Sequence, residues 1–227
     1  MNERSRVRVE RGGPYVVSGD VPLRRTAQIE TEYGEPIGWE PLEPVDVRAV
    51  TADGSYRLCR CGQSGERPFC DTTCERIEWD WAEVGSRSPR SERVRTFVGE
   101  QIVMTDDRSL CVNAGHCGDR FTTVWEMIAD TADPAIRARV QHMVSLCPSG
   151  RLAWAPAEGA DDVEPDYRPE VALVRDGPVW VRGGVSVESE DGTPYEIRNR
   201  VTLCRCGGSR NKPFCDGTHG RIGFREG

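Results

Sequence analysis

The chain has 227 residues, 37% of them hydrophobic, which is enough apolar surface to bury the core of one large domain or two small ones. The formal net charge is -7 and Lys212 is the only lysine, so we expect no dense basic face and no nucleic-acid partner. No stretch holds the ~18 consecutive apolar residues of a membrane helix, and the first residues do not resemble a signal peptide. We therefore expect a cytoplasmic protein with no membrane partner, whose ten cysteines bind metal rather than form disulfides.

The N-terminal part of the chain predicts short β-strands. Apolar residues alternate with polar ones within residues 15–17, 21–23 and 56–58, which is typical of strands with one buried face. The segment between the second and third of these carries Pro36, Pro41 and Pro44. Because proline lacks the backbone N–H that pairs strands, we expect a structural loop there.

The first four cysteines follow directly, and they are Cys59, Cys61, Cys70 and Cys74. In an extended segment, side chains at i and i+2 point the same way, so the first two sulfurs can bind one metal atom together. The last two are four residues apart and fit the first turn of a helix. Asp71 can cap that helix, and we expect Asp71 and Ser64 to support the ligands through hydrogen bonds.

The middle of the chain has a different pattern. A strand-like segment, residues 97–104, precedes Cys111, Cys117 and Cys147. Asp133 and Pro134 form a helix start, and the helix that follows should end near Cys147. Its apolar face is formed by Ile136, Val140, Met143 and Val144. A last strand is expected at residues 152–154.

Two histidines lie in this middle segment. His116 is adjacent to Cys117, and neighbouring residues on a tight loop seldom reach the same corner of a metal cluster, so we assign His116 a supporting role. His142 lies beside the apolar face of the predicted helix, and we interpret it as a partly exposed surface residue.

The C-terminal part again predicts strands, within residues 179–181, 185–187 and 201–203. Asp191-Gly192 lies between two of these runs and is a hairpin turn signal. The remaining ligand candidates follow at the same spacing as the first set, and they are Cys204, Cys206, Cys215 and His219. Asp216 and Ser209 are expected to support them as Asp71 and Ser64 do in the first set.

The two outer parts of the chain are repeats of each other. Residues 58–79 and 203–224 are identical at 13 of 22 positions, and the upstream stretches 13–23 and 177–187 are also alike. We therefore divide the chain into two related modules, residues 1–93 and 161–227, that flank an insert of residues 94–160.

The second motif, CRCGGSRNKPFCDGTH, resembles the signature of the CDGSH iron-sulfur proteins, the mitoNEET-like family, in which three cysteines and one histidine hold a [2Fe-2S] cluster. The resemblance implies that Cys204 and Cys206 bind the inner iron, and that Cys215 and His219 bind the outer one. In the first motif a cysteine replaces the histidine at position 74, so we predict a second [2Fe-2S] cluster with four cysteine ligands. Structural zinc has the same ligand types, but zinc sites commonly use C-x2-C pairs.

The insert, with CVNAGHC and the later CPSGRLAW, resembles small single-cluster bacterial ferredoxins and the divergent ferredoxin-like domains fused to CDGSH modules. A member with four cysteines would carry one at the position of Ala114. Three thiolates suit a [3Fe-4S] cluster, which we favour. They also suit a [4Fe-4S] cluster whose fourth iron binds His116, water or another exogenous ligand.

These observations predict a strand-rich α+β fold in which the two CDGSH modules form a dimer-like pair within one chain, with the ferredoxin-like insert alongside. We find no motif for a catalytic reaction, and we expect one-electron transfer with an unidentified redox partner protein. One alternative is storage of a cluster, its transfer to an apo iron-sulfur acceptor, or sensing of redox state or pH. Another is a zinc-stabilised interaction module.

Overall fold

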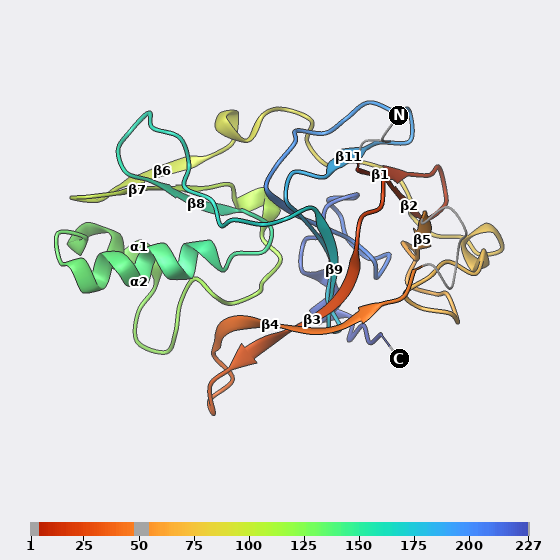
Figure 1. Ribbon diagram of the computed structural model, residues 1–227, viewed down its shortest axis with the longest axis horizontal. Helices are drawn as coiled ribbons and strands as arrows, with labels where there is room; N and C mark the ends of the chain where they lie inside the picture. Colours follow the sequence, from red (N-terminus) through yellow and green to blue (C-terminus); the bar gives the residue numbers. More distant parts are fainter. Residues whose placement is uncertain (1–4, 48–54, 227) are drawn as a thin grey trace.

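The structure is a computed structural model that describes residues 5–47 and 55–226. It is a strand-rich α+β fold with three sheets (Figure 1). The strands are β1 (Arg6–Val9), β2 (Tyr15–Ser18), β3 (Leu23–Glu30), β4 (Pro36–Val45), β5 (Tyr56–Leu58), β6 (Arg95–Val98), β7 (Val103–Asp106), β8 (Leu152–Ala155), β9 (Glu170–Val174), β10 (Val179–Arg182), β11 (Ser186–Glu188) and β12 (Arg200–Leu203). The helices are α1 (Val124–Met127), α2 (Pro134–Ser145) and α3 (Thr218–Arg221), with 3-10 turns at Thr73–Glu75, Arg90–Glu92, Arg108–Leu110 and Ile128–Asp130.

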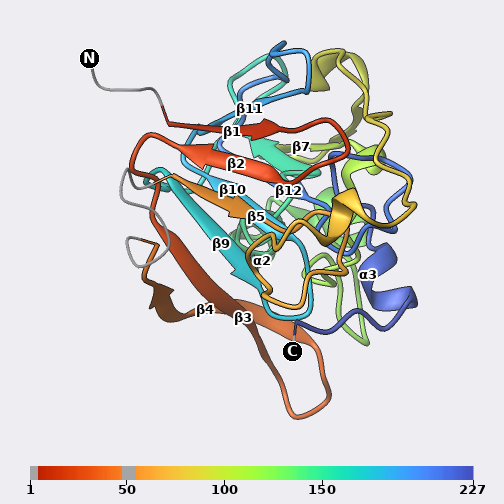
Figure 2. The same cartoon turned by 90° about the vertical axis from the view of Figure 1, so that its right-hand side faces the viewer.

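Both larger sheets contain strands from the two ends of the chain. One has the order β11-β1-β2-β5 and the other β12-β10-β9-β3-β4 (Figure 2). Strand β11 pairs in parallel with β1, placing Val187 opposite Val7, and β3 pairs in parallel with β9, placing Leu23 opposite Val171. The third strand of each repeat thus joins the sheet of the other repeat. The two halves therefore cannot separate without breaking both sheets.

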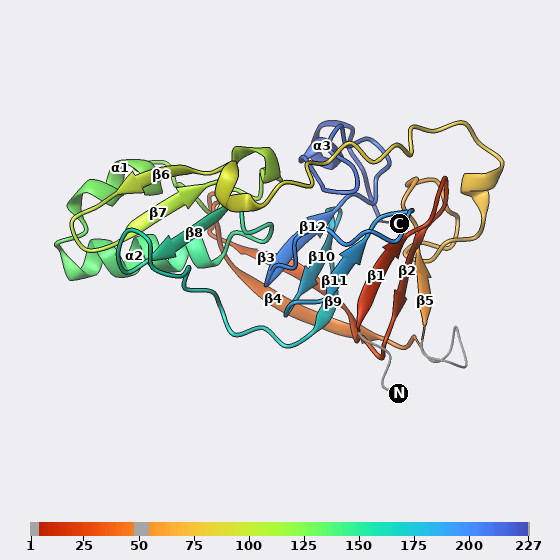
Figure 3. The ribbon, with the colours of Figure 1, turned by 90° about the horizontal axis from the view of Figure 1, so that it is seen from above.

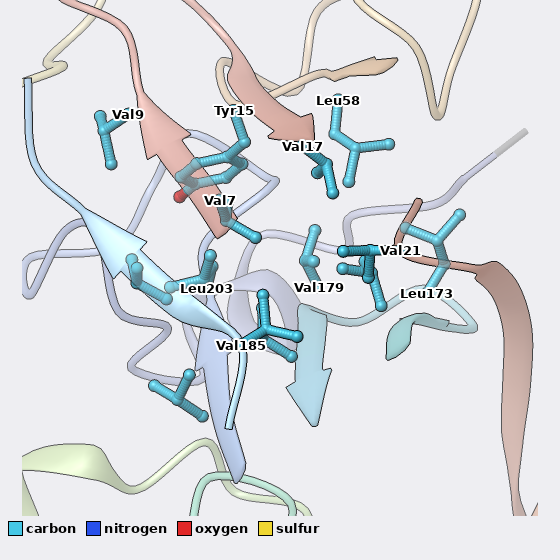
Figure 4. Packing of buried hydrophobic residues seen from close by; sticks show 14 of the residues in the cluster. Val7, Val9, Tyr15, Val17, Val21, Leu58, Leu173, Val179, Val185 and Leu203 are labelled. Carbon is cyan, nitrogen blue, oxygen red and sulfur yellow. The ribbon is translucent and has the colours of Figure 1, made fainter. Parts of the chain in front are cut away.

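The main core lies where these two sheets meet. Figure 4 shows apolar side chains from both repeats converging there, among them Val7, Tyr15 and Val17 from the N-terminal part and Val179 and Leu203 from the C-terminal part. All five are fully buried. Burying one such side chain stabilises the fold by roughly 1.5–3 kcal/mol, so the core holds the two repeats in one unit.

The proline-rich segment expected to be a loop is instead strand β4, and that prediction was wrong. Strand β4 pairs only with β3 and forms the edge of the five-stranded sheet. At an edge, a proline can face away from the neighbouring strand and lose no ladder hydrogen bond. The pairing shifts register between Arg24 and Thr26, beside Pro41 and Pro44, which accommodates these prolines.

The hairpin signal at Asp191-Gly192 produces a turn but does not join two paired strands. Gly192 has a φ of 81° and its backbone N–H donates to the carbonyl of Ser189. The returning chain makes one bridge, Glu188 to Pro194. Strands β11 and β12 belong to different sheets, because β11 is the strand donated to the N-terminal repeat.

The insert forms one end of the molecule and the two larger sheets the other (Figure 3). Its sheet has the order β6-β7-β8, so the strand-like run at 97–104 is two strands, and the strand expected at 152–154 is β8. Helix α2 begins as predicted, with Asp133 as its cap and Pro134 in its first turn. Its apolar face packs on the insert's sheet through Val140 and Val144, which are fully buried. Within the described residues, no helix is long and apolar enough to span a membrane.

Candidate metal centres

The C-x-C pairs lie at the ends of two equivalent strands. Strand β5 ends at Leu58, directly before Cys59, and β12 ends at Leu203, directly before Cys204. The two sulfurs of each pair, Cys59 with Cys61 and Cys204 with Cys206, are 3.8 Å apart. A tetrahedral metal with metal–sulfur bonds of about 2.3 Å separates two of its ligands by about 3.8 Å. Each pair is therefore spaced to bind one metal atom.

The second ligand pairs lie at the starts of short helical turns. Cys70 Sγ and Cys74 Sγ are 3.7 Å apart, and Cys215 Sγ is 3.3 Å from His219 Nδ1. The residue before each turn has left-handed backbone geometry, with a φ of 66° at Thr72 and 79° at Gly217. The cysteine at position 74 thus takes the place of the histidine in the other repeat.

The eight outer ligands are arranged as separate pairs. Among the residues that the structure describes, no group of three or more His, Cys, Asp or Glu side chains is placed to hold one metal ion. Two pairs, each spaced for its own metal atom, fit a centre with two metals.

Two aspartates shape the loops that carry the outer pairs. Asp71 accepts hydrogen bonds from the backbone N–H groups of Gly65, at 2.8 Å, and Thr73, at 3.0 Å. Asp216 does the same for Arg210 and Thr218, both at 3.0 Å. These backbone hydrogen bonds hold the pKa of the Asp71 carboxyl well below its usual range. Both aspartates therefore hold their loops through backbone hydrogen bonds, while their support of the metal ligands stays a prediction.

Two serines close the same loops. The hydroxyl of Ser64 donates to the carbonyl of Phe69 at 2.7 Å, and Ser209 donates to Phe214 at the same distance. The loops also direct backbone N–H groups at sulfur. Thr72 donates to Cys70 Sγ and Gly217 donates to Cys215 Sγ, both at 3.4 Å. Such hydrogen bonds stabilise a thiolate and tune the potential of a cluster that it binds.

The residue inside each C-x-C pair is a buried arginine, which sequence reasoning did not single out. Arg60 donates to the carbonyl of Glu10 at 3.3 Å and packs against the ring of Trp79. Arg205 donates to the carbonyls of Val174 and Gly177 at 2.6 and 2.7 Å. The two positions are equivalent in the repeat, so the shared C-R-C string was the signal that could have found them. Because neighbouring side chains in an extended segment point opposite ways, each arginine extends away from the two sulfurs and anchors the C-x-C segment to the backbone of another part of the chain.

The cysteines of the insert surround a cavity of about 280 Å³. Cys111 follows a 3-10 turn, Cys117 precedes α1 and Cys147 follows α2, so three elements bring distant residues together. Ala114 also lines the cavity. The space is far larger than one ion needs. It therefore has room for a cluster of several atoms beside the three cysteines.

Arg151 is a second residue that the sequence did not reveal. Its Nη1 donates to Cys111 Sγ at 3.0 Å, and the same guanidinium forms a two-pronged ion pair with Asp106 at 2.6 and 2.8 Å. Both partners are buried. Asp106 raises the pKa of Arg151 above its ordinary value, so the cation persists beside the sulfur. One arginine among many carries no local signal for this role.

His116 lines the cavity, but its ring is engaged with another part of the chain. Gln28 Nε2 is 3.2 Å from His116 Nε2 and also donates to the carbonyl of Ala114 at 2.6 Å. The ring packs on Trp39 of strand β4. Burial lowers the pKa of His116 to about 4, so it is neutral and accepts from Gln28. Nδ1 of the same ring is buried without a hydrogen-bond partner, so this geometry is compatible both with the supporting role predicted for His116 and with ligation. His142 is exposed on α2, as expected.

Comparison with known families identifies all three parts. Residues 12–73 and 176–220 match the family described as iron-binding zinc finger, CDGSH type. Residues 97–156 match a family described as a divergent 4Fe-4S mono-cluster. The first of these matches ends one residue before Cys74, whereas the second includes His219.

A comparison with curated proteins and one with solved structures found no match. The family matches imply [2Fe-2S] clusters for the outer modules and a [4Fe-4S] cluster for the insert, so they do not support our preference for [3Fe-4S]. The chain is an iron-sulfur protein in which two CDGSH-type iron-binding segments flank a divergent 4Fe-4S mono-cluster domain.

Proposed function

We propose that the protein is a one-electron carrier that exchanges electrons with an unidentified redox partner protein. The observation that carries this proposal is the spacing of the outer ligands in four pairs, each suited to one metal atom of a cluster. A bound cluster supplies a site that gains and loses single electrons. The chain's own residues supply the ligands, the N–H groups that point at sulfur and, at the insert site, the Arg151 guanidinium beside Cys111.

The ligand sets that we propose are those predicted from the sequence. Cys59, Cys61, Cys70 and Cys74 hold one [2Fe-2S] cluster, and Cys204, Cys206, Cys215 and His219 hold the other. Cys111, Cys117 and Cys147 hold a [4Fe-4S] cluster, which replaces our preference for [3Fe-4S]. Its fourth iron takes His116, water or another exogenous ligand, because Ala114 cannot bind iron and only Nε2 of His116 contacts Gln28.

The two outer sites differ in the charge of one ligand. Cys74 brings a thiolate where His219 brings a neutral ring nitrogen, so the all-cysteine site carries one more negative charge. That charge favours the oxidised state, and we infer a lower reduction potential at the N-terminal site than at the C-terminal one. Of the two outer clusters, the one at the His219 site is therefore reduced first.

The strand exchange between the repeats supports an internal dimer-like pair. Each repeat keeps its first, second and last strands in its own sheet. The C-terminal repeat gives β11 to the other sheet, and the N-terminal repeat gives β3 and β4. The cysteine-bearing loops follow the last strands, β5 and β12, so the shared sheets fix one site relative to the other. We infer that the two CDGSH modules act as one pseudo-symmetric unit.

A second candidate function is supported by the geometry of His219. The histidine is only partly buried at the outer end of its site, where it can be protonated or exchanged. A protein that stores its cluster, transfers it to an acceptor, or senses redox state or pH would do so through this partly exposed histidine ligand. Protonation of the ring nitrogen competes with iron, so acid would release this cluster before the Cys74 one.

Reversible reduction distinguishes these functions. We expect anaerobic protein to be reduced by dithionite and reoxidised in air over repeated cycles with its visible spectrum retained. Transfer of the cluster to an apo-ferredoxin during such cycles would overturn the carrier role in favour of a cluster donor. A colourless protein that contains zinc would contradict both of these functions and would support only a zinc-stabilised interaction module.

A further inference from the structure

The two outer sites touch each other at their C-x-C ends. Gly62 directly follows Cys61, and a Cβ atom added there would lie 2.6 Å from the carbonyl oxygen of Cys206. Gly207 directly follows Cys206, and a Cβ there would lie 2.3 Å from the carbonyl oxygen of Cys61. Only glycine permits this approach, which brings the inner ligand pairs of both modules together.

The opposite end of the C-terminal site touches the insert. Gly217 lies between Cys215 and His219, and a Cβ added there would lie 2.5 Å from Asn113 Nδ2 and 3.0 Å from the carbonyl oxygen of Val112. Glycine is again required, because the insert's cysteine loop packs against this backbone. The Asn113 side chain fills the space between the two sites.

A series of contacts links Cys111 Sγ of the insert to Cys215 Sγ of the C-terminal site. Asn113 Oδ1 lies 3.4 Å from Cys111 Sγ, and the N–H of Gly217 donates to Cys215 Sγ at 3.4 Å. One side chain and one backbone N–H therefore connect a ligand of the insert to a ligand of the C-terminal site. The thiol of Cys111 also contributes to raising the pKa of Cys215, although burial of Cys215 is the main cause.

Further hydrogen bonds hold the insert in this position. Asn211 Nδ2 donates to the carbonyl of Ser109 at 2.8 Å. Arg200, which is 1% exposed, donates to the carbonyl of Cys147 at 2.8 Å and to two other carbonyls at the end of α2. Arg200 begins β12, the strand that leads into Cys204. Figure 3 shows α3 between the insert and the loop that follows β5.

The outer end of the N-terminal site has a different environment. Thr72 occupies the position equivalent to Gly217, with the same left-handed backbone, yet its side chain is exposed. Cys70 is partly exposed, whereas the equivalent Cys215 is 2% exposed. The two sites thus differ in which outer ligand is exposed, since Cys70 is partly exposed and Cys74 buried in the first, whereas Cys215 is buried and His219 partly buried in the second.

We propose that the C-terminal site is the junction of the three, joined to the N-terminal site through Gly62 and Gly207 and to the insert through Asn113 and Gly217. This inference rests on the proposed electron-carrier function. An electron that enters at either end reaches the other end through the C-terminal site. Each transfer oxidises one site by one electron and reduces its neighbour by one, with no bond made and no proton moved. An external one-electron donor supplies the electron.

EPR spectroscopy of the dithionite-reduced holoprotein tests whether the C-terminal site lies between the other two, because nearby unpaired electrons broaden each other's signals. Nitrogen coupling from His219 identifies the C-terminal signal. In Cys147→Ser, with the insert cluster lost, we expect the C-terminal signal to sharpen and the N-terminal signal to stay unchanged. Equal sharpening of both signals, or no change at the C-terminal one, would overturn the inference. A wild-type protein without any cluster signal would instead refute the proposed function.

Asn113→Gly provides a test that keeps every ligand. Its φ of 56° suits glycine, so the loop retains its shape while the bridging side chain is removed. After photoreduction we expect electron equilibration between the insert and the C-terminal site to lose its fast phase. The control Asp20→Gly, at a left-handed position between β2 and β3 with a φ of 54°, should equilibrate as the wild type does. An unchanged fast phase in Asn113→Gly, with iron content intact, would show that Asn113 is not the connection.

Discussion

Replacing Arg151 tests how the protein tunes its insert site. The guanidinium lies 3.0 Å from Cys111 Sγ and is paired with the buried carboxylate of Asp106. Removing the arginine alone would leave that carboxylate unpaired, at a cost of roughly 3–5 kcal/mol in stability. The informative change is therefore Arg151→Gln together with Asp106→Asn, which keeps hydrogen bonding and removes both charges.

The expected effect follows from the distance. A unit charge about 4 Å from the guanidinium gains about 4 kcal/mol at an effective dielectric constant of about 20. An added electron spreads over the whole cluster, so about a quarter of that energy, roughly 1 kcal/mol, applies to the Cys111 sulfur. The more distant charge of Asp106 offsets only part of it. For a one-electron couple the double variant therefore lowers the reduction potential by at most about 40 mV.

A redox titration followed by EPR measures this potential directly. The matched control is Arg93→Gln with Asp107→Asn, because Arg93 and the buried Asp107 form a similar pair at 2.7 Å nearby. We expect the insert potential to fall in the first variant and to stay unchanged in the control. Equal shifts in the two variants, or none in either, would refute the assignment of Arg151 as the residue that tunes this site.

Three further changes test other parts of the structure. Thr72→Gly should raise the free energy of unfolding in urea by about 1 kcal/mol, because a β-branched residue is strained at a φ of 66°; a lower midpoint would contradict this. His219→Cys should keep its visible absorbance at mildly acidic pH where the wild type bleaches, because protonation no longer competes with iron; bleaching as fast as the wild type would count against ligation by His219. Arg200→Met should lower the free energy of unfolding by about 2–4 kcal/mol, because buried carbonyls around Cys147 lose their donor. Thermal unfolding measures that loss, and a wild-type melting temperature would show that these hydrogen bonds do not hold the insert.

The parts of the structure that depend on neighbouring residues could be predicted from the sequence. The two-residue spacing of Cys59 and Cys61 placed both sulfurs on one side of a strand end, since side chains alternate along a strand. Asp133 and Pro134 fixed the start of α2, because capping and the φ of proline are local properties. The supporting role of Asp216 likewise follows from its place before a helical turn.

The parts that depend on distant residues could not be predicted. Strand β4 is tolerated despite its prolines only because it lies at a sheet edge, and the edge is set by strands far away in the chain. The exchange of β3 and β11 between repeats is a long-range pairing that leaves no local pattern. Arg151 and Arg200 reach their partners across the fold and look like ordinary surface residues in the sequence.

Iron and acid-labile sulfide analysis of anaerobically purified protein tests the central claim that paired ligands hold iron-sulfur clusters. Two [2Fe-2S] clusters and one [4Fe-4S] cluster predict about eight iron atoms and about eight sulfides per chain, without zinc. Zinc bound at one or more sites, with no acid-labile sulfide present, would contradict the account.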